Sequence, residues 1–262
     1  MTLLRVLTWM ALAPLLAGAA PHDTHLTLRE VSGALAKATP GRPAVFATLD
    51  LSYLDLSNLD FRQADLHGAN LYGADLSDAD LSRANLAGAN LDHTVIIRTN
   101  FAGADLSNVS MFAAVAYSTL DVSNSKAPNF TGANLAGATI VARLGRAKLS
   151  GANLTQVHMG ADSKQLRTNL YNDLSGSDLT EADLSRADLR GARFAFARFT
   201  HANLSGADLS RADLFHADLS GADLTGADLS DANIAEAVLS DARGIGRTER
   251  PDQAHGGALP DR

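Results

Sequence analysis

Residues 64–91 read ADLHG ANLYG ADLSD ADLSR ANLAG ANL, so that one pattern returns every five residues. Each unit has a small residue, then Asp or Asn, then a central Leu, and ends in two residues rich in Ser, Gly, Asp and Asn. Outward from this stretch the pattern continues over 51–111 and returns over 174–239, with shorter runs at 130–140 and 149–159. Self-similarity at a fixed period indicates a solenoid rather than a globular domain.

A period of five fits neither the 3.6 residues of a helical turn nor the two-residue alternation of a long strand. It fits a chain that turns a corner every five residues. The small residue and the Leu stand two apart, so in extended backbone they share a face, and the Asp or Asn between them points to the other side. We expect four such sides to close a coil of twenty residues. The span 50–240 then corresponds to about nine or ten coils, stacked at the strand spacing of about 4.8 Å.

Strings such as ADLHG at 64–68 and GADLT at 221–225 resemble the pentapeptide-repeat family. The resemblance implies an all-β chain folded as a right-handed quadrilateral β-helix. A leucine-rich repeat is the main competitor, but it needs a period of about 20–29 residues with a distinctive Asn, which is missing. Gyrase-targeting members of the family often have a C-terminal dimerising helix. The sequence has no such helix, so we expect a monomer or a weak dimer.

The composition excludes several functional classes. Of 262 residues, 46% are hydrophobic but only 5% are aromatic, so Leu and Ala predict a narrow interior of constant width. The formal net charge of −7 argues against binding to nucleic acid or anionic lipid. Cys is absent, which excludes disulfides, thiolate metal sites and Cys nucleophiles.

The first residues have the features of a targeting segment. A short n-region with Arg5 precedes an apolar run over 6–17, and Ala17-Gly18-Ala19 is a small-x-small cleavage pattern. The apolar run is shorter than the roughly twenty residues that span a bilayer, which disfavours a membrane anchor. We therefore predict a signal peptide over 1–19, cleavage after Ala19, a periplasmic or secreted protein, and no stable membrane insertion after cleavage.

The repeat domain is predicted over 46–240, between an N-terminal segment at 20–45 and a disordered tail at 241–262. An amphipathic helix is expected over 27–38, where it would cover the first coil. At the start of the repeats, Leu replaces the usual small residue at Leu49, Leu54 and Leu59. This enlargement suits the end of a stack that packs against a helix.

The repeat is irregular at 112–128, 143–146 and 160–173. We interpret the first two as slips that each delete one residue. The third is expected to replace two or three sides and to leave the coil as a loop. Loops on rigid scaffolds often carry function, although a tolerated insertion remains the alternative.

The many Asp residues invite a catalytic or metal reading, which the pattern disfavours. Asp before the central Leu is expected to be outward, hydrated and of ordinary pKa. Stacked carboxylates, as at Asp188, Asp208 and Asp228, suggest at most weak Ca²⁺ binding, and the cluster around His22 and His25 suggests at most a loose metal site. The sequence has no G-x-S-x-G motif and no Gly-rich phosphate loop, and the repeats contain no pair of His residues at metal-binding spacing. We predict no catalytic residue, no metal site and no cofactor.

One patch breaks the acidic pattern. Arg193 and Arg198 occupy positions that elsewhere hold Asp, and each has an Asp twenty residues before and after it. Phe196 is expected to point outward, next to His216. Local charge compensation explains the Arg residues, and a partner-binding patch is the functional alternative. The candidate partner-binding residues are Arg190, Arg193, Phe196, Arg198 and His201, with Ser163, Lys164 and Arg167 of the predicted loop.

These observations favour a non-enzymatic exported scaffold that binds an unidentified protein and no nucleic acid. The first alternative is a DNA mimic that interacts with a topoisomerase such as gyrase, as some family members do. A weak metal-binding surface is the second alternative.

Overall fold

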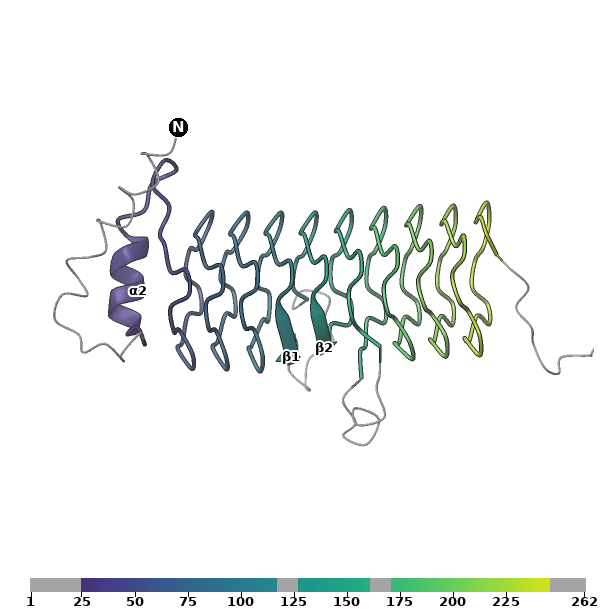
Figure 1. The fold of residues 1–262 in the computed structure, drawn as a ribbon, viewed down its shortest axis with the longest axis horizontal. Helices are drawn as coiled ribbons and strands as arrows, with labels where there is room; N and C mark the ends of the chain where they lie inside the picture. The colour runs from purple at the N-terminus through teal and green to yellow at the C-terminus, as the bar shows by residue number, and fades with distance from the viewer. Residues whose placement is uncertain (1–24, 117–126, 161–170, 246–262) are drawn as a thin grey trace, which may run out of the picture.

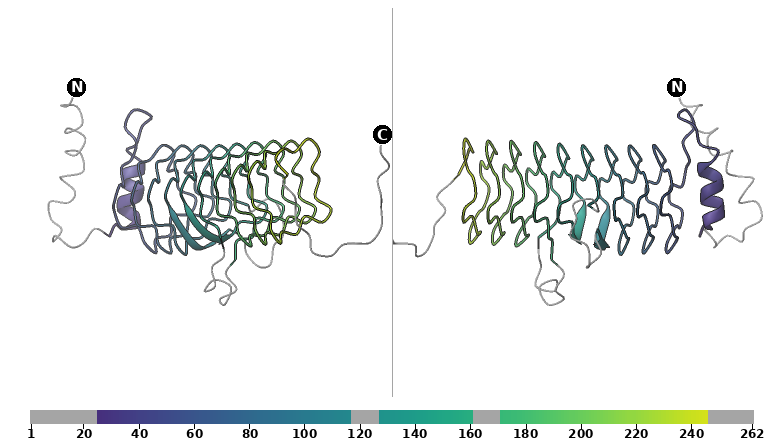
Figure 2. Two further views of the ribbon diagram at one scale, coloured as in Figure 1. Left: turned by 45° about the vertical axis from the view of Figure 1, so that its right-hand side comes forward. Right: turned by 180° about the vertical axis from the view of Figure 1, so that it is seen from behind.

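The computed structural model describes residues 25–116, 127–160 and 171–245. It shows a β-helix, a row of stacked coils with helix α2, Leu28–Leu35, across the N-terminal end (Figure 1). Two longer strands, β1 at Ser110–Val115 and β2 at Thr139–Arg143, pair in parallel in the middle of the stack. Views from other sides show the same coils in an unbroken row (Figure 2). Within the described ranges, no helix has the length and apolar character to cross a bilayer.

Parallel backbone bridges join each Asp or Asn position to its counterpart in the next coil. In the regular parts the counterpart is twenty residues on, so each coil has four outward positions. We name the four faces of the rod by the second coil: face A holds Asp65, face B Asn70, face C Asp75 and face D Asp80. The two residues between neighbouring faces form a corner, named by the faces that it joins. The handedness of the coil stays a prediction.

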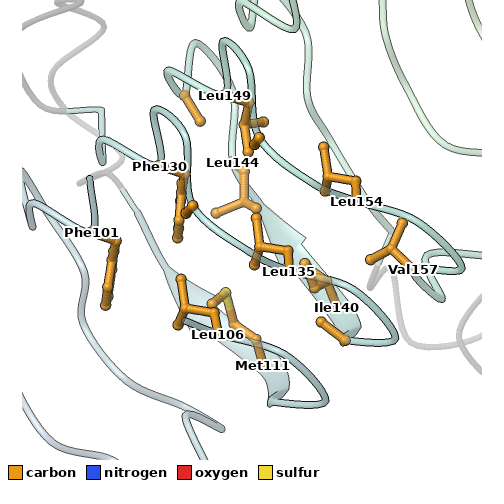
Figure 3. Packing of buried hydrophobic residues seen from close by; sticks show 14 of the residues in the cluster. Phe101, Leu106, Met111, Phe130, Leu135, Ile140, Leu144, Leu149, Leu154 and Val157 are labelled. Atoms are coloured by element: carbon orange, nitrogen blue, oxygen red, sulfur yellow. The ribbon is translucent and has the colours of Figure 1, made fainter. Parts of the chain in front are cut away.

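The interior confirms the predicted inward pattern. Small residues and central Leu-like residues are almost completely buried, as at Ala69 and Leu71. Larger centres stack on each other from coil to coil; the rings of Phe101 and Phe130 lie parallel, with centroids 5.0 Å apart (Figure 3). Alternation of Ala and Leu keeps the width of the coil constant, so that each ring of side chains fits on the next.

The outward Asp residues form the corners. The Oδ1 of Asp183 accepts the backbone N–H of Ser185 at 2.9 Å, and Asp208 does the same for Ser210 at 3.0 Å. The second corner residue then adopts a positive φ, 56° at Arg186. This is the Asx turn, in which a short polar side chain replaces a backbone acceptor.

The expectation of fully hydrated Asp residues was wrong at most ladder positions, and that of an ordinary pKa was wrong at Asp55 and Asp228. Most ladder carboxylates are half-buried, because the corner backbone folds over them. The pKa of Asp55 is lowered by the hydroxyl and the backbone N–H of Ser57, and that of Asp228 is lowered in the same way by Ser230. These hydrogen bonds favour the ionised form, so the carboxylates are structural groups.

Helix α2 closes the first coil. Thr27 and Glu30 form a reciprocal capping box at its start. Val31 is completely buried, and the backbone N–H of Leu26 donates to the carbonyl of Asp50 at 2.8 Å. Leu49, Leu54 and Leu59 are partly buried against the same core. The helix lies within the predicted range 27–38 but ends earlier, at Leu35.

The irregular segments differ from their prediction. Val115 follows its partner Val95 by twenty residues, whereas Asn129 follows its partner Asn100 by 29. The side between Val115 and Asn129 therefore contains nine additional residues, and the predicted one-residue deletion at 112–128 was wrong. An insertion of nine residues is one residue short of two full repeats. It therefore shifts the phase of the repeat in the same way as the deletion of one residue.

A true deletion lies in β2, where Thr139 and Arg143 are consecutive ladder positions only four residues apart. The segment 160–173 replaces no side, contrary to its prediction. Instead, ten additional residues lie within the single side between His158 and Asp173. Asn172 is buried here; its amide donates to the carbonyls of Ile140 and Met159, at 2.9 and 2.7 Å.

At the C-terminal end the ladder extends beyond the predicted limit of 240. Arg243 still pairs with Asp223 in the preceding coil. The residues beyond 245, which include most of the predicted tail, lie outside the described part of the chain, as does the predicted signal peptide.

Because the interior is narrow, truncating one central Leu-like residue should lower the stability of the fold severely. Replacing the buried Leu204 by Ala should lower the free energy of unfolding by about 2–5 kcal/mol, because the neighbouring coils cannot collapse into the cavity. The exposed Arg211→Ala variant should stay within about 0.5 kcal/mol of the parent. Urea unfolding followed by circular dichroism measures both. Equal urea midpoints for the two variants would contradict a close-packed interior.

The Asx turns predict a loss of stability in acid. The pKa values of Asp55 and Asp228 are lower in the folded chain than in the unfolded chain, so the unfolded chain takes up protons first as the pH falls. The free energy of unfolding should therefore hold from about pH 7 to 5 and fall below about pH 4. The double variant Asp55→Asn/Asp228→Asn keeps the acceptor oxygens but cannot titrate there. It should lose less melting temperature between pH 5 and 3 than the parent. Identical acid profiles would show that these carboxylates do not contribute.

Candidate interaction face

The four faces differ in how closely they keep the Asp or Asn pattern. Face A keeps it everywhere except at its two ends: Val45, Asp65, Asn85, Asp105, Asn134, Asn153, Asp183, Asn203, Asp223 and Arg243. Face C departs from it in the middle: Asp55, Asp75, Val95, Val115, Arg143, Asp173, Arg193, Asp213 and Asn233. Both insertions also lie in sides that border face C, one between Val115 and Asn129 and one between His158 and Asp173. Face C is therefore the side on which the chain is most specialised.

Arg193 and Arg198 lie between Asp residues of neighbouring coils, as predicted. Arg198 pairs with Asp178 and Asp218 along face D, and its Nη1 lies 3.6 Å from Asp178 Oδ2. Partial burial opposes ionisation of Asp178, but hydrogen bonds from the hydroxyl and N–H of Thr180 outweigh it and lower its pKa, with a contribution from Arg198. The ion pair is exposed, so it contributes about 0–1 kcal/mol.

Arg193 makes an additional contact that sequence analysis missed. Its guanidinium lies over the ring of Tyr171, 4.0 Å from the centroid, and Arg143 approaches the same ring at 5.1 Å. Tyr171 thus joins the coils before and after the second insertion through two cation–π contacts. The repeat register gives no signal for this contact, because Tyr171 directly follows the second insertion and the sequence pattern does not say where such a side chain points.

Phe196 is the centre of an aromatic group at corner C–D. Its ring is 62% exposed and stacks on His216, with centroids 5.1 Å apart and an interplanar angle of 16°. Phe215 contacts both rings edge-on, at 5.7 and 4.2 Å. The Nε2 of His216 lies 3.0 Å from Glu236 in the last coil. We call Phe196, Phe215 and His216 the Phe196 cluster.

The stacking of Phe196 on His216 confirms the predicted position of Phe196. Sequence analysis missed Phe215 and Glu236. Glu236 stands twenty residues after His216, so the same register that placed His216 next to Phe196 also places Glu236 next to His216. Phe215 is the first residue of its corner, a position that the repeat pattern treats as unspecified.

Two other predicted residues lie away from the Phe196 cluster. Arg190 is at corner B–C, where Asp188 binds it at 2.8 Å and raises its pKa; the same hydrogen bond lowers the pKa of Asp188. His201 is at corner D–A, with its ring against Gly221. Of the predicted patch, only Arg193, Phe196 and Arg198 therefore lie at corner C–D or at the ladder positions beside it. Ser163, Lys164 and Arg167 lie outside the described residues.

A second aromatic group, which sequence analysis also missed, follows corner B–C through the first four coils. Tyr53, Tyr72, His93 and Phe112 form a continuous row, with successive centroids 5.4, 5.1 and 5.8 Å apart. We call this row the aromatic ridge. Its members alternate between the second and the first position of the corner, so they are separated by 19 or 21 residues and escape a search at a period of twenty.

The described residues contain no group of three His, Asp or Glu side chains with the geometry to hold a metal ion. The stacked Asp208 and Asp228 instead accept the N–H of Ser210 and Ser230, at 3.0 and 2.8 Å. His22 lies outside the described residues. The distinctive side chains of the described surface are thus aromatic rings and guanidinium groups held on a repeating frame.

Comparison with known proteins agrees with this architecture. A family model described as pentapeptide repeats matches residues 49–83, 74–111, 173–206 and 207–243, with 8 copies. The search of curated proteins gave no match.

Several solved structures are similar to the chain. HetL, a pentapeptide repeat protein involved in heterocyst differentiation regulation in the cyanobacterium Nostoc, is 31% identical, with 78% of this chain and 87% of HetL covered and a TM-score of 0.44. A trypsin-treated form of QnrB1, a plasmid-mediated fluoroquinolone resistance protein, is 20% identical, with 72% and 88% covered and a TM-score of 0.46. A pentapeptide repeat protein from the thylakoid lumen of Arabidopsis thaliana is 25% identical, with 48% and 74% covered and a TM-score of 0.24.

Proposed function

We propose that this chain, which belongs to the pentapeptide-repeat family, is a non-enzymatic exported scaffold that binds another protein at the Phe196 cluster. The right-handed, four-sided coil that the family resemblance implies is part of this proposal. The rod supplies rigidity, and its specialised corners supply the contacts.

The exposed ring of Phe196 is the observation that carries the proposal. A ring that is 62% exposed on a polar rod has no role in the core. It is nevertheless held in one orientation by His216 and Phe215, so little side-chain entropy is lost when a partner covers it. Arg193 and Arg198 occupy the ladder positions on either side of corner C–D, and an aromatic ring in the same region as Arg residues has the composition of an interface hot spot.

The DNA-mimic alternative has weaker support. Face A has Asp at four of its ten positions and Lys or Arg only at its last, Arg243, which favours it. However, its carboxylates are half-buried and bonded to their own corners, and amide side chains alternate with them, as where Asn203 donates to Asp183 at 3.1 Å. Export, which we infer from the N-terminal pattern, would also separate the protein from a cytoplasmic topoisomerase. The metal-binding alternative has no cluster among the described residues to support it.

A crosslinking pull-down tests the proposed surface. Truncating Phe196 and Arg198 together to Ala should reduce capture of a partner from intact cells at least tenfold, because hot-spot truncations each remove about 2 kcal/mol or more. Arg62→Ala/Arg83→Ala, two exposed Arg residues at corner D–A of the first coils, is the matched control and should capture normally. Capture that survives the Phe196 and Arg198 changes would exclude this surface.

Export makes a separate prediction. Mass spectrometry of the protein purified from fractionated cells should give a chain that begins at Ala20, in the periplasmic or extracellular fraction. A chain that retains Met1 and stays in the cytoplasm would contradict export and would favour the DNA-mimic alternative.

A further inference from the structure

We propose that the aromatic ridge binds a neutral, unbranched, β-linked glycan chain that lies along corner B–C. The ridge is far along the rod from the Phe196 cluster and on a different corner, so the inference is independent of the proposed protein partner.

The aromatic ridge exposes its rings to solvent, and contacts with neighbouring residues hold the rings in place. Tyr53 is 73% exposed, and its ring lies against Gly73, where a Cβ atom would come within 2.9 Å of the Cδ1 atom. His93 is exposed, and Tyr72 and Phe112 are half-buried. Edge-to-face contacts between neighbours hold the rings in place. Apolar C–H faces of sugar rings stack on aromatic surfaces of this kind.

Hydrogen-bonding groups line the face B side of the ridge. Asn70, Asn90 and Ser110 replace Asp at successive levels, so this part of face B is uncharged. The Nδ2 of Asn90 donates to Asn70 Oδ1 at 3.2 Å, which accounts for one of its two hydrogens. Groups that repeat once per coil in this way are suited to the hydroxyls of a regular polymer.

The charges near the ridge select for a neutral glycan. Asp50, Asp55 and Asp75 lie beside its first coils, and Asp92 lies within it, accepting the Ser110 hydroxyl at 2.6 Å. In the next coils face C turns apolar, at Val95 and Val115. Carboxylates accept hydrogen bonds from sugar hydroxyls but repel a polyanion, and the corner residues beside the four rings, at 52, 73, 92 and 113, include no Lys or Arg to offset that repulsion.

The spacing of the rings distinguishes a glycan from a peptide. Ring centroids follow at 5.1–5.8 Å, and because corner positions alternate, equivalent rings return every second coil, or about 9.5 Å. An extended β-linked glycan also alternates the face of successive sugars and repeats with every second one. Side chains on one face of a peptide strand repeat at about 6.7 Å and lose register within a few coils. A helix, with a pitch of about 5.4 Å, has no such alternation and docks in grooves rather than on a convex corner.

Titration calorimetry with the full chain and two soluble probes tests the inference. The probes are β-1,4-linked hexasaccharides of glucose and of N-acetylglucosamine. We expect binding of at least one, and at least a tenfold loss of affinity in Tyr53→Ala/Tyr72→Ala. Tyr53→Phe/Tyr72→Phe keeps the rings, so its affinity should stay within about threefold of the parent. A change of that size is smaller than the about 1.4 kcal/mol that a tenfold loss of affinity represents. Phe196→Ala/His216→Ala removes the other aromatic surface and should bind as the parent does.

Three results would overturn the inference: binding of neither hexasaccharide, equal affinity for the parent and the Tyr-to-Ala variant, or equal affinity for a hexasaccharide of galacturonic acid. Both Tyr residues are on the surface, so the variants should melt with the parent. A melting temperature that matches the parent, measured by circular dichroism, assigns any loss of affinity to the ridge itself. Failure of this test leaves the Phe196 pull-down unaffected, because the two surfaces share no residue.

Discussion

Backbone hydrogen bonding between consecutive coils is the constraint on which the rest of the structure depends. The N–H of each central residue donates to the carbonyl of the ladder residue in the next coil, as Leu204 does to Asp223 at 2.7 Å, and the N–H of that ladder residue donates back, from Asp223 to the carbonyl of Ala202 at 2.9 Å. This ladder leaves a bore wide enough for one small residue and one Leu-like residue per side. A shift of one residue in register would turn Asp inward, where an unpaired charge is costly.

The same constraint determines what the polar residues do. Asp is abundant because at most corners its carboxylate accepts a backbone N–H, and Ser is frequent because it tolerates the turn and in places donates its hydroxyl to the same carboxylate, as Ser230 does to Asp228. Thr94 and Thr99 stand inside, in place of Ala, and their hydroxyls donate to the carbonyls of Leu91 and Leu76, both at 2.7 Å. Polar groups are thus used within the frame, which leaves the exposed aromatic rings at corners, such as that of Phe196, as groups available to a partner.

Much of the fold could be predicted from the repeat. The inward and outward positions, the helix at the N-terminal end and the position of Phe196 beside His216 all follow from a period of five and a coil of twenty. The state of the Asp residues did not follow, because an Asx turn depends on the local path of the corner backbone rather than on the spacing of residues. The insertions were misread as a deletion and as lost sides, because an insertion of nine and a deletion of one change the phase of a five-residue repeat identically.

The sequence by itself determined the architecture, since a strict alternation of small, polar and Leu-like residues has one way to bury its apolar side chains. Only the tertiary structure decided which specialised residues meet. Tyr171 contacts Arg143 and Arg193, which lie before and after an insertion whose length sets the register. The aromatic ridge forms because rings at the two alternate positions of a corner project toward the same line. Contacts of this kind depend on where a side chain points from a corner whose second residue has a positive φ. The period of the repeat does not encode that direction.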